Sequence, residues 1–233
     1  MIATPSSSRH DIYRNIHKGL RGMMFETVLL VGRTSPADAT AVAATLDEVE
    51  RLLAFMAAHV KHENEHVHTA IEARTPGGAR RTTDDHHEHV ESLDTLRAEV
   101  AALRSLAGDT VGPALHRLYL DLCEFVAENL QHMRVEETHN NAQLWSLYSD
   151  PELGAIHARL LASVEPGVMA EAITCMARGL SLPELLDLVL DARANAPAPA
   201  FGAMLELIES QAGPARWSAL AAALERADAA LAA

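Results

Sequence analysis

The sequence is short of several residue types, and each shortage narrows the kinds of protein it can encode. Its two cysteines, Cys123 and Cys175, have no metal-binding or redox spacing, which argues against a thiolate site and favours a reduced, cytoplasmic compartment. Basic residues number 19 against 32 acidic ones, and the net charge of −13 argues against a nucleic-acid or anionic-membrane partner. No apolar run reaches the roughly 18 residues of a membrane-spanning helix, and the start of the chain lacks the apolar segment of a signal peptide.

Aromatic residues are also few, at 4%, although hydrophobic residues make up 48% of the chain. Alanine and leucine supply most of that hydrophobic content, which favours helices. The unusual number is 13 histidines, most of which lie between His10 and His139. The histidines are therefore concentrated in the region that is patterned as helices.

Four long segments show apolar residues at alternating spacings of three and four, which is typical of amphipathic helices. The first covers residues 9–32, the second begins at Ser35-Pro36-Ala37-Asp38, the third follows Thr83, and the fourth begins near Pro113. Together they predict an all-α fold, an up-down-up-down four-helix bundle within a domain of residues 1–149.

Residues 150–233 have a different character. They form short apolar helices separated by proline and glycine, and they contain one histidine and no cluster of metal-ligand residues. We expect a helical C-terminal extension packed on or beside the bundle. This extension could serve in packing, as a lid, or in assembly into a homo-oligomer.

In each helix of the bundle, histidine or glutamate continues the apolar seam. These residues come early in the first and third helices and late in the second and fourth, so an up-down-up-down bundle brings them to one end. The candidate ligands are His17, then His59 and Glu63, then His86 and His89, and finally His132 and Glu136.

Two of these sets are His-x-x-x-Glu pairs, whose side chains lie one helical turn apart on one face. Burying several carboxylates and imidazoles together costs several kcal/mol per charge unless something compensates them. A divalent cation supplies that compensation, and nitrogen and oxygen ligands suit iron, manganese or zinc. A hydrogen-bonded polar layer without metal is the alternative.

The order of His17, His59 with Glu63, His86 or His89, and His132 with Glu136 resembles the hemerythrin-like family with its His-His-Glu cation-binding domain. The resemblance covers roughly residues 10 to 148. It implies a four-helix bundle holding a non-haem iron centre, commonly two irons bridged by the carboxylates and an oxo or hydroxo group. It also implies reversible O2 binding, oxygen or redox sensing, iron handling, or a response to nitric oxide or peroxide.

The first hypothesis is therefore a binding or sensing protein that holds one or two irons and meets a small ligand such as O2. The second is an enzyme that acts on O2 or peroxide at the same centre. The third is a helical interaction protein without metal, and zinc or manganese could replace iron in the first.

Three of the remaining histidines are further candidates on the seam side. His66 and His139 lie one heptad beyond the inner pairs, about 10 Å further along their helices, too far to share a metal with those pairs unless that end of the bundle is open. A role at the rim, in an outer shell or in a zinc site stays open for both. His10 is a further candidate on the seam side. We expect three more to face solvent: His62, His68 and His87.

Overall fold

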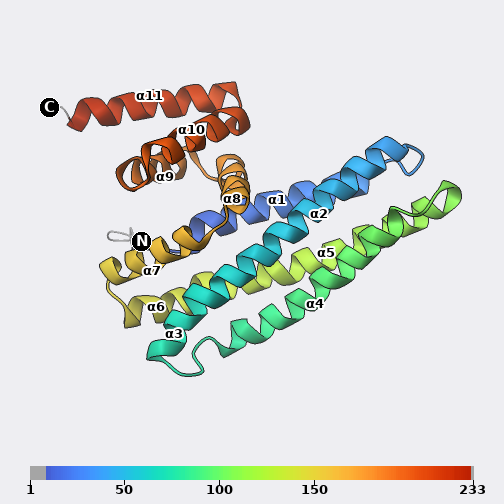
Figure 1. The fold of residues 1–233 in the computed structure, drawn as a ribbon, viewed down its shortest axis with the longest axis horizontal. Coiled ribbons are helices and arrows are strands. Elements are labelled where there is room, and N and C mark those ends of the chain that lie inside the picture. The colour runs from blue at the N-terminus through green and yellow to red at the C-terminus, as the bar shows by residue number, and fades with distance from the viewer. Residues whose placement is uncertain (1–8, 232–233) are drawn as a thin grey trace, which may run out of the picture. The chain divides into compact units, whose positions relative to one another are not determined.

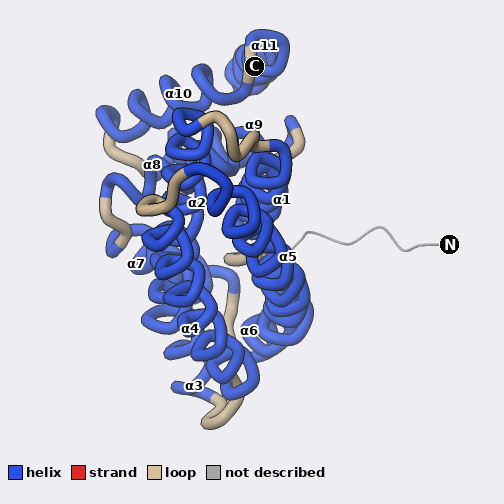
Figure 2. Tube along the Cα trace, turned by 90° about the vertical axis from the view of Figure 1, so that its right-hand side faces the viewer, coloured by secondary structure: helices blue, strands red, loops and turns tan. Residues whose placement is uncertain are grey.

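The computed structural model describes residues 9–231, and helices form nearly all of that range (Figure 1). Figure 2 shows short loops between the helices, and residues 9–231 contain no strand. The all-α fold class predicted from the sequence is confirmed.

The chain forms two compact units. The first consists of the chain up to Arg14 together with Met24–Val164. The second consists of Asn15–Met23 together with the chain from Glu165 onward. Helix α1 (Arg14–Arg33) contributes residues to both units, so the up-down-up-down order of four helices stays a prediction.

Three helical rods make up most of the first unit. The rods are α2 (Ala39–His62) with η1 (Glu63–His68) and α3 (Thr69–Arg74), then α4 (Arg80–Leu103), then α5 (Val111–Val135) with η3 (Glu136–Asn140) and α6 (Asn141–Leu147). The colours in Figure 1 show successive rods running in opposite directions, and α4 packs against both α2 and α5. Helix α7 (Asp150–Ser163) follows them and packs against η1, so this unit extends past residue 149, where the predicted domain ended.

The apolar seams predicted from the sequence are buried along these rods. Burial of each such side chain contributes roughly 1.5–3 kcal/mol, which fixes the rotation of each rod about its axis. The buried residues include Leu46, Val49, Leu52 and Met56 on α2, Leu93, Leu96 and Val100 on α4, and Leu115, Leu118, Leu122 and Phe125 on α5. The polar residues that continue each seam are therefore turned inward as well.

Three helices begin at residues other than those predicted. Helix α1 begins at Arg14 rather than at residue 9. Asp38, not Ser35, caps α2, because its side chain accepts a backbone N–H of the first turn. Helix α4 begins at Arg80 rather than after Thr83.

The early start of α4 follows from a short, well-bonded loop. The Glu72 carboxylate accepts the backbone N–H groups of Gly77, at 2.7 Å, and Ala79, at 2.9 Å. Gly77 has a φ of 79°, a conformation that glycine adopts without strain. The chain turns within these residues and is ready to become helical at Arg80.

Both rods that carry a His-x-x-x-Glu pair change from α-helix to π-helix at the glutamate. The π-helical turn η1 begins at Glu63 and the turn η3 begins at Glu136. A π turn holds one more residue than an α turn, which rotates the following side chains by roughly 100° about the helix axis. The residue five positions after Glu63, which is His68, therefore lies on the same face as the glutamate.

The second unit contains α8 (Pro166–Gly179), α9 (Leu182–Asn195), α10 (Ala198–Ala212) and α11 (Pro214–Leu231). Its core includes Leu185, Val189, Ile208 and Leu220. Lys18 forms an ion pair of 2.6 Å with Glu184, the residue that also completes the capping box of α9. No single described helix is long and apolar enough to cross a membrane, although α7 and α8 taken together reach that length and composition.

Candidate metal centre

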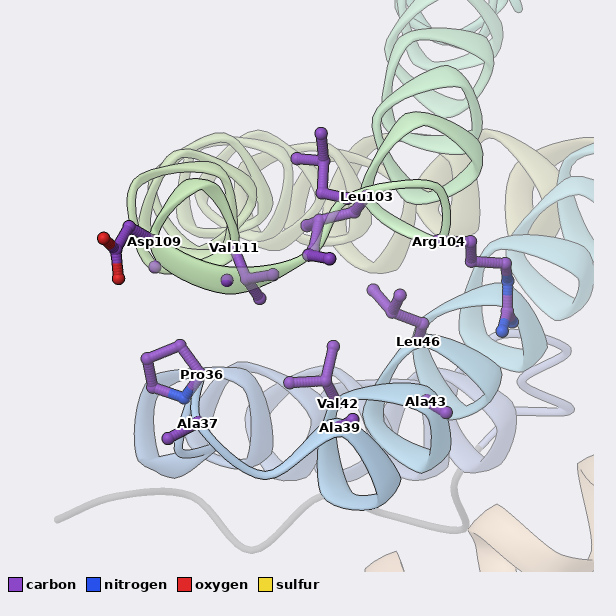
Figure 3. Close-up of a pocket in the computed structure, with 14 residues that line it drawn as sticks. Pro36, Ala37, Ala39, Val42, Ala43, Leu46, Leu103, Arg104, Asp109 and Val111 are labelled. Carbon is purple, nitrogen blue, oxygen red and sulfur yellow. The ribbon is translucent and has the colours of Figure 1, made fainter.

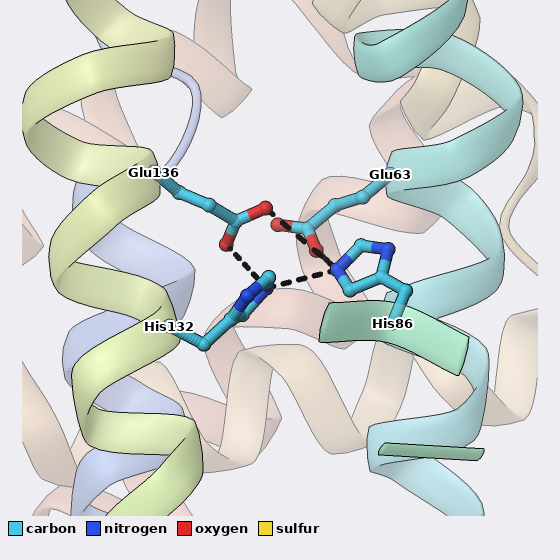
Figure 4. A group of neighbouring side chains, drawn as sticks. All are labelled: Glu63, His86, His132 and Glu136. Atoms are coloured by element: carbon cyan, nitrogen blue, oxygen red, sulfur yellow. Dashed lines mark hydrogen bonds and ion pairs between the residues drawn. The ribbon is translucent and has the colours of Figure 1, made fainter. Parts of the chain in front are cut away.

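Two glutamates and two histidines from the three rods meet in the core of the first unit. One ligand atom from each of Glu63, His86, His132 and Glu136 lies within 4.8 Å of the others, and all four residues are buried. Figure 4 shows the two carboxylates facing each other with both imidazoles beside them. These four residues are the candidate centre.

The two predicted His-x-x-x-Glu pairs are formed. His59 Nε2 lies 3.2 Å from Glu63 Oε1, and His132 Nε2 lies 3.2 Å from Glu136 Oε2. Helical spacing brings each pair onto one face, because the backbone stays α-helical up to the glutamate.

The outer nitrogen of each central imidazole is held by an acceptor. His86 Nδ1 lies 2.8 Å from Asn64 Oδ1, and His132 Nδ1 lies 3.1 Å from Asp85 Oδ2. The Nδ1 of each ring therefore carries a proton and donates it, which directs the Nε2 of each ring toward the centre.

These two Nε2 atoms lie only 2.9 Å apart. Two imidazoles that each present a lone pair at that distance repel one another unless a proton or a cation lies between them. With Nδ1 bonded outward, such an arrangement is typical of histidines that bind a metal. The donor set of imidazole and carboxylate therefore fits a cation of the kind that prefers nitrogen and oxygen ligands.

Charge within the centre supports the same conclusion. Burial lowers the pKa of His132, but the hydrogen bond to Glu136 and the charges of Glu136 and Glu63 raise it to about 9. Burial and the charge of Glu63 oppose ionisation of Glu136, yet its bond to His132 holds its pKa below the usual range. The protonated His132 thus compensates part of the buried negative charge, at the atom where a cation would bind.

His86, rather than His89, is the histidine of α4 that belongs to the group of four. The two had been left as alternatives by the sequence. His86 Nε2 lies 3.4 Å from Glu63 Oε2, and the His86 ring is fully enclosed. His89 is buried next to the group, with its ring 4.7 Å from that of His132, centroid to centroid.

His68 was predicted to face solvent, and this prediction was wrong. The π turn η1 rotates it inward, where it is buried and stacks on His86 with the ring centroids 4.7 Å apart. Its Nε2 lies 3.1 Å from Thr82 Oγ1 and 3.6 Å from Glu136 Oε1. Because the Thr82 hydroxyl donates to Ala79, His68 is the donor to Thr82, and its N–H also lies toward the Glu136 carboxylate.

A second polar layer lies beside the centre. Asn140, from the π turn η3, donates to both Thr82 Oγ1 and the Tyr13 hydroxyl. Burial raises the pKa of Tyr13 well above 10, and the charges of Glu136 and Glu63 raise it further. Tyr13 belongs to the core, and the two carboxylates of the centre act on its pKa.

Other predicted positions are not among these four residues. His17 is fully buried on α1, in the part assigned to the second unit, and its role as a ligand stays a prediction. His139 is exposed, and His66 contacts Ser163 at 2.9 Å. The π turns explain both, since they move the expected heptad positions off the seam. Two further histidines differ from each other: His62 is buried, which contradicts its predicted exposure, whereas His87 is exposed as predicted.

A separate pocket of about 850 Å³ lies where α2 and α5 begin and α4 ends (Figure 3). Pro36, Val42, Leu46 and Leu103 line it, and none of its lining residues is a histidine. It lies about 30 Å along α2 from Glu63, at 1.5 Å per residue. This pocket is not a candidate for the metal centre.

Comparison with known families identifies the chain. A family model described as the hemerythrin HHE cation-binding domain matches residues 9–144, which include every predicted ligand. Comparisons with curated proteins and with solved structures found no match.

Proposed function

This chain belongs to the hemerythrin family of HHE cation-binding domains, and we propose that it binds iron, as a pair of ions, at the centre formed by Glu63, His86, His132 and Glu136. The bound iron would give the protein a site for O2 or a related small ligand, for sensing or for iron handling. When bound, non-haem iron supplies reversible ligand binding and a change of oxidation state.

The observation that carries the proposal is the 2.9 Å approach of His86 Nε2 and His132 Nε2. Asn64 and Asp85 hold both outer nitrogens, so each ring presents its inner nitrogen to the same point. Two buried carboxylates lie at that point and give it negative charge, which the proton on His132 offsets in part. A bound cation offsets the cost of burying those charges.

The arrangement of the carboxylates supports two ions rather than one. Glu63 has Oε1 beside His59 and Oε2 beside His86. Glu136 has Oε2 beside His132 and Oε1 nearer to His86, at 3.8 Å. Each carboxylate thus lies between two imidazoles, which is the position of a bridging ligand. We propose His17 as an additional ligand, from the sequence pattern and the family alone.

Elemental analysis after anaerobic loading with Fe²⁺ tests the proposal. We expect about two irons per chain, as in other two-metal sites, and a near-ultraviolet absorption band after oxidation in air. Glu63→Ala should lose most of the iron. The matched control Glu65→Ala, an exposed position in the same π turn, should keep it.

Fewer than about one iron per wild-type chain would overturn the proposal, since the centre would then not hold the metal. If the site fills equally well with Zn²⁺ or Mn²⁺ and shows no oxidation band, the metal is zinc or manganese and not iron. Multiple turnovers with peroxide, lost in Glu63→Ala, would support the enzymatic alternative.

A further inference from the structure

An acidic groove runs along the surface of the first unit between α4 and α5. It forms a pocket of about 470 Å³, and no lysine or arginine is among its described lining residues. The carboxylates that line it are Glu88, Glu91, Asp121, Glu124 and Glu128. Such a concentration of one charge attracts cations and raises their local concentration.

The groove adjoins a second pocket, which one residue of the candidate centre lines. This second pocket, of about 190 Å³, shares Glu88 and Glu128 with the groove. Asp85, His89 and His132 also line this inner pocket. Since Asp85 accepts the outer N–H of His132, the inner pocket reaches the back of a residue of the centre. The groove and the inner pocket thus lie side by side, and the inner pocket, which Arg81 also lines, reaches the Nδ1 side of His132.

His89 is the residue between the groove and the centre. Its side chain is 4% exposed, and its Nδ1 has no hydrogen-bond partner within the described residues 9–231. Leaving a buried imidazole nitrogen without a partner costs about 1–3 kcal/mol, so such an atom requires an explanation. Its ring meets that of His132 edge-on, at an interplanar angle of 84°, and yet it stands outside the group of four.

The acids at the inner end of the groove are close enough to repel one another. Burial raises the pKa of Glu128, and the charges of Glu124 and Glu88 raise it further. A passing divalent cation relieves this repulsion, whereas an anion or a neutral ligand does not. The charge therefore favours a cation as the species that uses the path.

We propose that the acidic groove and His89 form a loading path for divalent cations. The carboxylates collect the hydrated cation, and His89 binds it transiently before it reaches His132 and Glu136. The inference rests on the proposed function, because it presumes that the centre binds a cation. It adds that His89 acts on the rate of loading and not on the final occupancy.

Stopped-flow mixing of the metal-free protein with Co²⁺, followed by its visible absorption, tests the path. We expect Glu88→Gln/Glu128→Gln to load roughly tenfold more slowly at low salt, with the difference shrinking as salt is added. His89→Leu should also load roughly tenfold more slowly and reach the wild-type stoichiometry. The matched control Glu206→Gln/Glu209→Gln changes the net charge equally, outside the groove, and should load at the wild-type rate.

Each outcome decides the matter. Wild-type loading rates in His89→Leu, or a salt-independent rate in the groove variant, would overturn the path. Loss of one cation at equilibrium in His89→Leu would also overturn it, by making His89 a permanent ligand. If His89→Leu does not fold, His89→Gln, which keeps a polar side chain, takes its place in the same measurement. A wild-type protein that takes up no Co²⁺ contradicts the proposed function itself, before any variant is compared.

Discussion

Cation binding should release a proton, because His132 and the cation compete for the same nitrogen. Burial lowers the pKa of His132, but Glu136, Glu63 and Asp85 together raise it to about 9. At neutral pH the metal-free ring therefore carries a proton on Nε2. We expect the affinity for Co²⁺ to rise about tenfold for each pH unit between pH 7 and about 9 and to level off above that value.

The stability of the metal-free protein should change in the opposite direction. A pKa raised from 6.5 to about 9 means that the folded state holds this proton more tightly than the unfolded chain. Its contribution, about 3 kcal/mol, is present below pH 6.5 and is lost as the pH rises through about 9. Raising the pH thus weakens the metal-free fold while it strengthens cation binding.

Isothermal titration calorimetry in two buffers of different ionisation heat counts the protons released. We expect about one proton per first cation at pH 7. Asp85→Asn should reduce this number, because it removes a charge that holds the proton on His132. Asp84→Asn, which changes the neighbouring acid that pairs with Arg80, should leave it unchanged. No proton release and an affinity that is flat from pH 7 to 8.5 would refute the reasoning.

Two further predictions concern packing around the centre and in the second unit. His68→Leu should lower cation affinity about tenfold, because the Glu136 carboxylate loses a neighbouring donor. The control His139→Leu, at an exposed position, should leave the affinity unchanged. A chelator competition assay measures both affinities, and equal values would contradict the role of His68. Gly19→Ala should destabilise the protein by about 1–3 kcal/mol, since the new methyl group would lie 2.6 Å from Cys175 Sγ. In Gly22→Ala the new methyl group would meet nothing within 4 Å, so this variant should be more stable by about 0.5–1 kcal/mol. Urea denaturation measures the free energy of unfolding of both variants, and changes of the same sign would contradict this packing.

The sequence predicts the inner residues of the centre because the backbone is α-helical as far as each glutamate. Beyond Glu63 the prediction fails, since the helix takes one extra residue in its next turn. His66 then leaves the seam and His68 enters it. The spacing of five between Glu63 and His68 predicts that both lie on one face only if the helix contains a π turn there.

The partners of the imidazoles could not be predicted in the same way. Asn64 is adjacent to Glu63, and Asp85 is adjacent to His86, so neither stands on the seam of its own helix. Their contacts depend on how the rods are rotated and offset against one another. The early start of α4 at Arg80 is set by hydrogen bonds in the preceding loop, which helix periodicity does not describe.

Anomalous diffraction at the iron absorption edge tests the central claim most directly. Crystals grown from iron-loaded protein should show anomalous density enclosed by Glu63, His86, His132 and Glu136. Density at a different group of residues, such as the contact between His10 and His157, would contradict the account. So would the absence of density between the Nε2 atoms of His86 and His132 in protein that contains iron by elemental analysis.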